Sequence, residues 1–528
     1  MNSSASSPEI PLRKNIFSYA FIFGLFLLAI SLPYSKFLMS LAQIILLLSW
    51  IWEGNLKEKF SRFIKNKTAL AVCSLFVLHA IGMLYTTDLH YGLEDLKKKI
   101  PLFLLPLLFS TSAPLPKVMF DRLISVFALS VISASFICFF VLLGYSGKQI
   151  LHPQEASIFI SHIRFGLLIG MTFFILGYFF SEQTSIILKI ISILLMIWLI
   201  AFLIMMESAT GLICIFVALT ILLIKTIFLN RNIRLRIALA AILLIECIFA
   251  VKIYYAAASD FVVSSGTELK STTASGNTYT HNTLNTEIEN GNFVWRNICE
   301  IELEEAWNKR SNIKYDGKDL RNNDIKYTLI RFLTSKGLMK DSEGVNTLSK
   351  EEQESIEKGI ANVNFVGLFN PTARLQKIMW EFDIYSKGGN PSGHSVVQRL
   401  EFSKAAIEII KENPIFGVGT GDVKNAFESQ YEKMNSPLTK EWRLRSHNQF
   451  LAITVGFGIA GLILFLTTLF YPLLIDKKIS DYLYLMFFVI AFLSMFPEDT
   501  LENQAGVTFF AFFNSLFLFL HKDNQSIQ

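Results

Sequence analysis

The sequence predicts an all-α polytopic membrane protein with about twelve transmembrane helices and one large extracytoplasmic loop. The 528 residues are 52% hydrophobic and only 17% charged, a composition typical of a chain embedded in lipid rather than of a soluble globule. Apolar stretches long enough to cross a bilayer recur along the chain. One polar stretch, residues 256–446, interrupts them and is far longer than an ordinary loop.

The apolar stretches define the predicted membrane helices, since a span needs about 20 mostly apolar residues. On that scale we expect helices at 17–33, 37–52, 68–86, 100–112, 123–145, 163–180, 186–206, 211–229, 237–255, 448–474, 482–496 and 505–520. The first stretch follows Arg13 and Lys14, as in a signal peptide, but it lacks a small-residue cleavage site and is predicted to remain as a helix. Pro101 and Pro106 predict that the fourth helix is tilted or re-entrant.

Basic residues predict the orientation, because short cytoplasmic loops are enriched in lysine and arginine. One side of the predicted bundle collects most of these residues: Arg13, Lys14, Lys57, Lys59, Arg62, Lys65, Lys67, Lys117, Arg122, Arg231, Arg234, Arg236, Lys477 and Lys478. We therefore expect this side, with both termini, to face the cytoplasm. Lys97–Lys99 map to the opposite side, so either the fourth helix is misplaced or these lysines meet an anionic group such as a lipid headgroup.

Three parts follow from this division: an N-terminal bundle (1–255), the large loop (256–446) and a C-terminal bundle (447–528). Residues 260–390 are polar, show little periodicity and suggest no chemistry. Residues 395–446 are different and form the predicted functional part of the loop. They begin with an amphipathic helix that ends before Pro414, as a proline requires.

Composition also excludes several classes of protein. No long basic run is interleaved with aromatic residues, so nucleic acid is not an expected partner. Four of the five cysteines lie in apolar stretches, and Cys299 is alone in the polar loop, so no disulfide framework is expected. No histidine or cysteine cluster has the spacing of metal ligands, and we expect neither a metal nor a cofactor.

The stretch "RLRSHNQF" places Arg443, Arg445, His447 and Asn448 against the start of a membrane helix. Charged and polar groups at that depth are costly unless the interface, water or a partner satisfies them. One interpretation is an anchor in the lipid headgroups, and the other is a reaction centre built around His447. Arg399, which opens the amphipathic helix leading into this stretch, favours the second interpretation.

Other polar residues lie at predicted helix ends. "SHIRFG" puts His162 and Arg164 at the outer mouth of the sixth helix, and a guanidinium is well suited to phosphate. Glu207 and the segment "PEDTLENQ" (497–504) are candidates to orient cations. Glu246 lies inside the ninth helix with only Lys252 as an apparent partner, and an intramembrane acid is a functional candidate by default.

Glycines mark two further features. "GVGTGD" (417–422) lacks the Lys-Ser/Thr of a phosphate-binding loop and predicts a tight turn in which backbone approaches the membrane. Gly456, Gly458 and Gly461 have the small-residue spacing that lets membrane helices pack closely.

The pairing of "ENPIFGVGTGD" (412–422) with "RSHNQFLAITVGFGIAGLILF" (445–465) resembles the O-antigen ligase and O-antigen polymerase family. The resemblance implies a glycosyltransferase C-like membrane fold with a large periplasmic loop between the ninth and tenth helices, in the bacterial inner membrane. It further implies glycan transfer from undecaprenyl pyrophosphate to an acceptor hydroxyl, without metal or cofactor. The expected partners are the lipid-linked donor, a lipid A-core or other glycan acceptor, and membrane lipids.

The resemblance also implies roles for individual residues. The essential histidine of the family maps onto His447, and an arginine maps onto Arg399. A further family arginine lies between helices seven and eight, where this chain has Ala209, and we hypothesise that Arg164 replaces it. Arginines would stabilise the pyrophosphate leaving group, and a neutral histidine would accept the proton of the attacking hydroxyl. Arg443 and Arg445 are additional candidates for pyrophosphate binding, with supporting roles for His162, Glu207 and Asn448.

Several functions share these motifs. O-antigen ligation to lipid A-core is favoured, and polysaccharide polymerisation and protein O-glycosylation are alternatives within the class. A transporter of the lipid-linked glycan is the alternative from another class, although no inverted repeats are visible. A non-catalytic scaffold is the third interpretation and predicts that His447 is dispensable.

Overall fold

The computed structural model describes residues 12–147, 150–259, 261–262, 268–367, 369–370 and 372–521. In these ranges the regular structure is almost entirely helical, with two short paired strands, β1 (Ile288–Glu289) and β2 (Asn292–Phe293). A helix coincides with every predicted membrane stretch: α1 (Leu12–Ser31), α2 (Lys36–Trp52), α4 (Lys67–Gly82), α6 (Pro101–Thr111), α7 (Lys117–Leu142), α8 (His162–Glu182), α9 (Ile186–Met205), α10 (Ala209–Leu229), α11 (Ile233–Ser259), α19 (Gln449–Leu474), α20 (Tyr482–Ser494) and α21 (Gln504–Ser515). The predicted all-α polytopic membrane fold is confirmed.

Not all of these helices are long enough to cross a bilayer by themselves. Among the described residues, six helices meet the length and composition of a membrane span: α7, α8, α9, α10, α11 and α19. Helices α2 and α3 (Leu56–Lys65) form a pair bent by 113°, and the other apolar helices are shorter. The count of about twelve crossings therefore stays a prediction.

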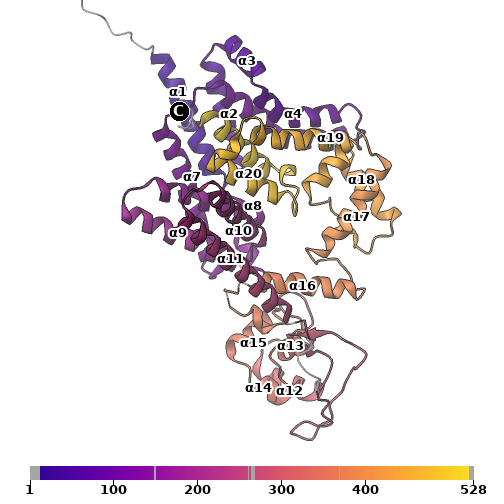
Figure 1. Ribbon diagram of the computed structural model, residues 1–528. Coiled ribbons are helices and arrows are strands. Elements are labelled where there is room, and N and C mark those ends of the chain that lie inside the picture. The colour runs from indigo at the N-terminus through magenta and orange to yellow at the C-terminus, as the bar shows by residue number, and fades with distance from the viewer. Residues whose placement is uncertain are drawn as a thin grey trace, which may run out of the picture.

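Helices α20 and α21 lie in the centre of the bundle (Figure 1). Nearly all of their side chains are buried, which is what a helix that is apolar on every side requires. Helix α20 packs on α8 and α10, and α21 packs on α6. This placement holds the turn between α20 and α21 inside the protein, and the candidate site is built on that turn.

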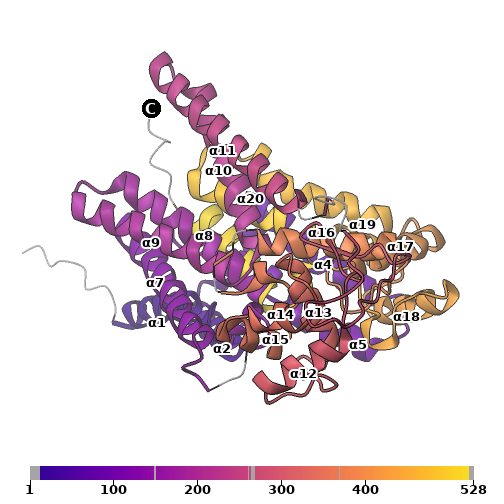
Figure 2. The same ribbon diagram turned by 90° about the horizontal axis from the view of Figure 1, so that it is seen from below.

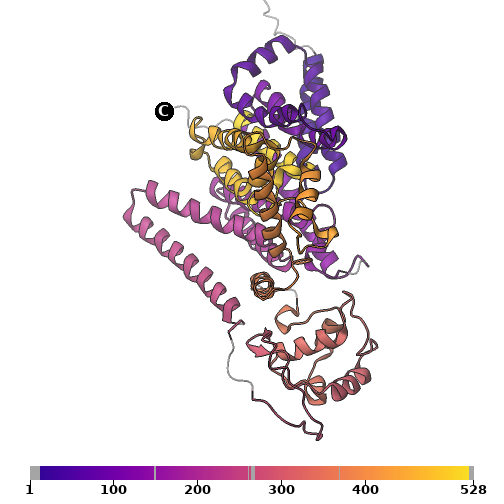
Figure 3. The same ribbon diagram turned by 90° about the vertical axis from the view of Figure 1, so that its right-hand side faces the viewer.

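Helix α11 has the opposite environment. It packs on α10 and α16 (Ala373–Ser386), and only Ala257 along its length is buried. Figures 2 and 3 show that it leans away from the rest of the bundle. Its apolar exterior suits lipid contact.

Of the three lysines that map to the unexpected side, Lys99 has acidic partners inside the protein. It ends helix α5 (Leu89–Lys99), directly before α6, whose place in the membrane stays a prediction. Its side chain is fully buried, with Nζ 2.9 Å from Asp95 Oδ2 and 2.8 Å from Glu502 Oε2. The anionic partner of Lys99 is thus a pair of carboxylates within the protein and not a lipid headgroup.

Residues 268–367 form a folded unit, which we call the loop lobe, at the lower end of the molecule in Figure 1. It contains α12 (Glu300–Arg310), α13 (Ile325–Ser335), α14 (Ser342–Asn346) and α15 (Lys350–Glu357). Its own hydrophobic core is centred on Trp307, Leu329 and Phe332. The weak periodicity of this region therefore hides an ordered structure made of short helices.

The glycine-rich turn fits into a break in α19. It connects α17 (Val397–Glu412) with α18 (Val423–Lys433), and at Gly458 the backbone of α19 is non-helical, with φ 64° and ψ −164°. Across this break Ile459 N donates to Pro414 O at 2.9 Å, and Gly419 N donates to Gly456 O at 2.8 Å. A Cβ on Gly417 would lie 2.4 Å from Gly456 C, so a side chain has no room there. The turn brings its backbone close to that of α19, and its predicted approach to the membrane stays a prediction. Gly458 breaks the helix and does not merely pack within it.

The orientation can be measured with reporter fusions. Fusions after Lys67, Arg236 and Lys478 are expected to report a cytoplasmic location, because the basic loops stay inside. Fusions within 270–440 are expected to report an extracytoplasmic location. Paired alkaline phosphatase and fluorescent-protein reporters at each site provide the measurement, and a cytoplasmic signal from the loop lobe would overturn the orientation.

Candidate active site

The site is built on three acidic residues, Glu498, Asp499 and Glu502, in the turn between α20 and α21. Glu498 and Asp499 are only 2% and 3% exposed. Buried carboxylates are stable only when cations and hydrogen bonds compensate their charge. Here the compensating cations come from α5, α8, α17 and the segment before α19, so the acidic turn gathers residues that are far apart in the sequence.

Two arginines share the carboxylate of Glu498. Arg399 Nη2 of α17 lies 2.6 Å from Oε1, and Arg164 Nη2 of α8 lies 3.3 Å from Oε2. Arg399 Nε also donates to Pro497 O at 3.0 Å. Burial by itself would raise the pKa of Glu498, but the neighbouring His447 and these two arginines outweigh it and lower the pKa to about 2.

Arg445 and Lys99 hold the other two acids. Arg445 lies 3.2 Å from Asp499 Oδ2 through Nη2 and 3.3 Å from Glu502 Oε2 through Nη1. Burial would raise the pKa of Glu502, yet Lys99 and Arg445 hold it below its usual value. The pKa of Asp499 is raised by burial, which exceeds the opposing effect of Arg445. Asp499 is thus the carboxyl of this turn that accepts a proton more readily than usual.

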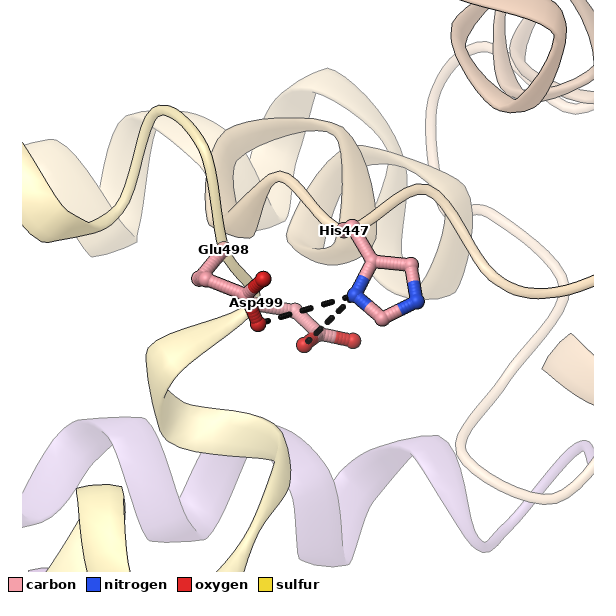
Figure 4. A group of neighbouring side chains, drawn as sticks. All are labelled: His447, Glu498 and Asp499. Carbon is pink, nitrogen blue, oxygen red and sulfur yellow. Dashed lines mark ion pairs between the residues drawn. The ribbon is translucent and has the colours of Figure 1, made fainter. Parts of the chain in front are cut away.

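His447 faces the same acids (Figure 4). Its Nδ1 lies 3.6 Å from Glu498 Oε2 and 3.9 Å from Asp499 Oδ1. Its backbone is left-handed, with φ 46°, a strained conformation for a residue with a side chain, and such strain clusters at functional sites. The ring of Phe402 packs at 5.6 Å from the imidazole. With Nδ1 on the carboxylate side, Nε2 points away from it and is the ring nitrogen placed to accept a proton.

The start of α19 is tied to the acidic turn. Asn448 caps the helix by accepting from Leu451 N at 2.9 Å, and its Nδ2 donates to Phe496 O at 2.9 Å. Gln449 accepts from Leu501 N at 2.6 Å. Asn448 therefore supports the position of His447, and Gln449 is a second support that the sequence alone did not reveal.

Arg443 and Glu207, two further candidates from the sequence, have ion-pair partners outside the acidic turn. Arg443 pairs with Glu432, and its Nε donates to Leu438 O at 3.1 Å, so the structure does not bring it to the acidic turn. Glu207 does hold a cation, since it lies 2.7 Å from Lys377 Nζ of α16.

The structure also gives the surroundings of two further polar residues that the sequence singled out, His162 and Glu246. His162 begins α8 and interacts electrostatically with Glu498, which places it near the acidic turn. Glu246 accepts a hydrogen bond from Thr220 Oγ1 at 3.0 Å, a partner the sequence did not indicate. A functional role for Glu246 stays a prediction.

His447, Glu498 and Asp499 are also positioned as metal ligands, because their ligand atoms lie within 4.8 Å of one another. The spacing of residues in the sequence does not reveal this set, because α19 and α20 separate the histidine from the two acids. Both carboxylates already face guanidinium groups, so a metal ion would have to displace Arg399, Arg164 or Arg445. A metal ion at these three residues would therefore compete with the guanidinium groups for the same carboxylate oxygens.

Because the pKa of Glu498 is low, the stability of the folded protein should depend on pH in the acidic range. A carboxyl whose folded pKa lies below its usual 4.5 contributes stability above pH 4.5 and loses it as the pH falls toward about 2. We expect the thermal unfolding midpoint to decline over this interval, and the decline to be smaller in Glu498→Gln, which cannot titrate. Unfolding of the detergent-purified proteins across the interval measures the difference, and equal slopes would contradict the assignment.

Comparison with known proteins found a similarity in one part of the chain. Residues 355–466 match the family model described as O-antigen ligase. No curated protein matches the chain. The matched segment includes Arg399, the glycine-rich turn, His447 and the first part of α19, whereas Arg164 and the acidic turn lie outside it. The chain is therefore a polytopic membrane protein in which residues 355–466 are similar to the O-antigen ligase family.

Proposed function

We propose that the protein transfers a glycan from undecaprenyl pyrophosphate to an acceptor hydroxyl at the periplasmic face of the bacterial inner membrane, and that the reaction is O-antigen ligation to lipid A-core. The observation that carries this proposal is the sharing of Glu498 by Arg399 and Arg164 beside His447. Two guanidinium groups aligned on the two oxygens of one carboxylate are placed to bind another anion that presents two or more oxygens. Pyrophosphate is such a ligand.

The reaction assigns a step to each group. His447 Nε2 accepts the proton of the acceptor hydroxyl as the oxygen attacks the anomeric carbon of the donor sugar. The bond from that carbon to the pyrophosphate oxygen breaks, and its electron pair leaves with undecaprenyl pyrophosphate. Arg399 and Arg164 stabilise the charge that develops there, and one well-placed donor contributes about 3–4 kcal/mol in comparable sites.

The carboxylates orient the catalytic groups. Glu498 and Asp499 face the Nδ1 side of His447, where they favour a proton on Nδ1 and leave Nε2 free to act as the base. The same carboxylates stabilise the imidazolium that forms during the reaction. Glu498 also keeps the two guanidinium groups near the reaction centre until the donor enters.

Transfer by the purified protein in lipid nanodiscs tests the proposal. The donor is undecaprenyl-pyrophosphate-linked glycan, and the offered acceptors are lipid A-core, a second lipid-linked glycan and a serine-containing protein. Ligation predicts product on lipid A-core alone. Product on the second glycan identifies a polymerase, product on the protein identifies an O-oligosaccharyltransferase, and no product on any acceptor contradicts the proposal. Transfer that stops on addition of a chelator and is restored by metal would show that the reaction needs a metal, for which His447, Glu498 and Asp499 are the candidate ligands.

A further inference from the structure

A cavity of about 1390 Å³ lies between the loop lobe, α16 and the loop that connects α7 to α8. Such a volume exceeds the roughly 300–1,000 Å³ of sites for single small molecules. Its wall combines aromatic, amide, imidazole and guanidinium groups, among them His152, Arg321, Asn322, Trp380, His394 and Trp442. The cavity is thus large enough, and polar enough, for an extended hydrophilic ligand.

Ser395 connects this cavity to the reaction centre. It lines the cavity, and its Oγ accepts a hydrogen bond from Arg374 Nη2 at 2.8 Å. Its carbonyl oxygen accepts a hydrogen bond from Arg399 Nη1 at 2.5 Å. One residue of the cavity wall is thus in direct contact with Arg399, the arginine to which we assign the pyrophosphate.

Several charged residues on the wall are already paired with one another. Lys377 pairs with Glu207, and Arg331 pairs with Glu289. Arg321 and Arg374 are different, because no carboxylate of the described residues lies within ion-pair distance of either guanidinium. The paired charges and the amides of the wall can therefore hydrogen-bond to sugar hydroxyls. The two guanidinium groups can bind either hydroxyls or acidic substituents of a sugar.

Trp380 supplies an apolar surface on this polar wall. The guanidinium of Arg331 lies 4.8 Å from its ring, and the ring of His394 packs edge-on at 5.3 Å. These contacts hold the indole in place. A fixed indole packs well against the apolar C–H face of a pyranose, while neighbouring amides bind its hydroxyls.

We propose that this cavity binds a glycan chain of several sugars and that the loop lobe serves as its outer wall. The glycan belongs either to the lipid-linked donor or to the acceptor, since both present the same chemistry. The proposal rests on the proposed function for the presence of a glycan at this membrane face. In this proposal the loop lobe, whose sequence shows no catalytic motif, selects the sugar chain.

Binding to the full-length protein in nanodiscs tests the proposal. One probe is the free oligosaccharide released by mild acid from the lipid-linked donor glycan, and the other is the core oligosaccharide freed of its lipid. Calorimetry is expected to detect binding of at least one probe to the native protein. Trp380→Ala is expected to weaken that binding by roughly tenfold, whereas Trp380→Phe, which keeps an aromatic ring, should retain most of it. Trp52→Ala, at the exposed end of α2, is the matched control and should bind normally.

The outcomes separate this inference from the proposed function. The probe whose binding depends on Trp380 identifies the donor or the acceptor glycan. If neither probe binds the native protein, or if Trp380→Ala binds as the native protein does, the cavity is not a glycan site, although transfer that depends on His447 would still stand. If Trp380 governs binding but His447→Ala transfers glycan normally, the glycan site stands and the proposed mechanism fails.

Discussion

Replacing His447 by alanine is expected to lower the rate of glycan transfer by about 10²–10⁴-fold, the usual contribution of a general base. The imidazole is placed for this role by Glu498 and Asp499 on its Nδ1 side and by Phe402 against its ring. Initial rates of the purified variants with lipid-linked donor and lipid A-core measure the effect. Membrane abundance should stay normal, because Glu498 keeps its ion pairs with Arg399 and Arg164 when the imidazole is removed.

The exposed histidine of α5 provides the control. His90→Ala removes an imidazole whose nearest acid, Glu94, is also exposed, and it should transfer at the native rate. A native rate for His447→Ala would instead mean that the histidine is an interfacial anchor. Loss of the protein from the membrane would leave the rate uninterpretable, so His447→Gln, which keeps the size and polarity of the side chain, is measured beside it and is expected to be equally inactive.

The helices could be predicted because apolar length is a local property of the sequence. Each predicted stretch coincides with a helix, from α1 to α21. The loop lobe could not be predicted, because its helices are short and its core joins residues as distant as Trp307 and Ile356. Short helices leave too few turns for a periodic pattern to emerge.

The candidate site shows the same division between local and long-range information. The sequence singles out His447 because a polar side chain beside a membrane helix is energetically costly. It also predicts that the acidic residues of 497–504 orient cations, and in the structure these residues form ion pairs with arginines. Sequence could not distinguish Arg445, which reaches the acidic turn, from Arg443, which pairs with Glu432. The two residues belong to a segment without regular structure, so their separation along the chain says little about where each side chain points. Lys99 was also hidden, since only the fold reveals that it is buried against Glu502.

Arg164→Ala is expected to reduce transfer as severely as Arg399→Ala, by about 10²–10³-fold for each missing donor. The reason is that both guanidinium groups face the same carboxylate, one at each oxygen of Glu498. Lysine at either position should recover little activity, because a point charge does not reproduce the planar fork that binds phosphate oxygens. Arg443→Gln, away from the acidic turn, is the matched control and should remain active.

Restoring an arginine at Ala209 tests whether Arg164 replaces the one that the family resemblance leads us to expect there. The starts of α8 and α10 touch, since a Cβ on Gly166 would lie 2.7 Å from Ser208 Oγ, so position 209 is close to the mouth of α8 that carries Arg164. The double variant Arg164→Ala with Ala209→Arg is therefore expected to regain part of the lost rate, while Ala209→Arg alone should change little. Near-native activity of Arg164→Ala would refute the replacement. It would leave Arg399 and Arg445 as the arginines at the acidic turn that bind the leaving pyrophosphate, with Glu498 pairing to Arg164 only to hold α8 in place.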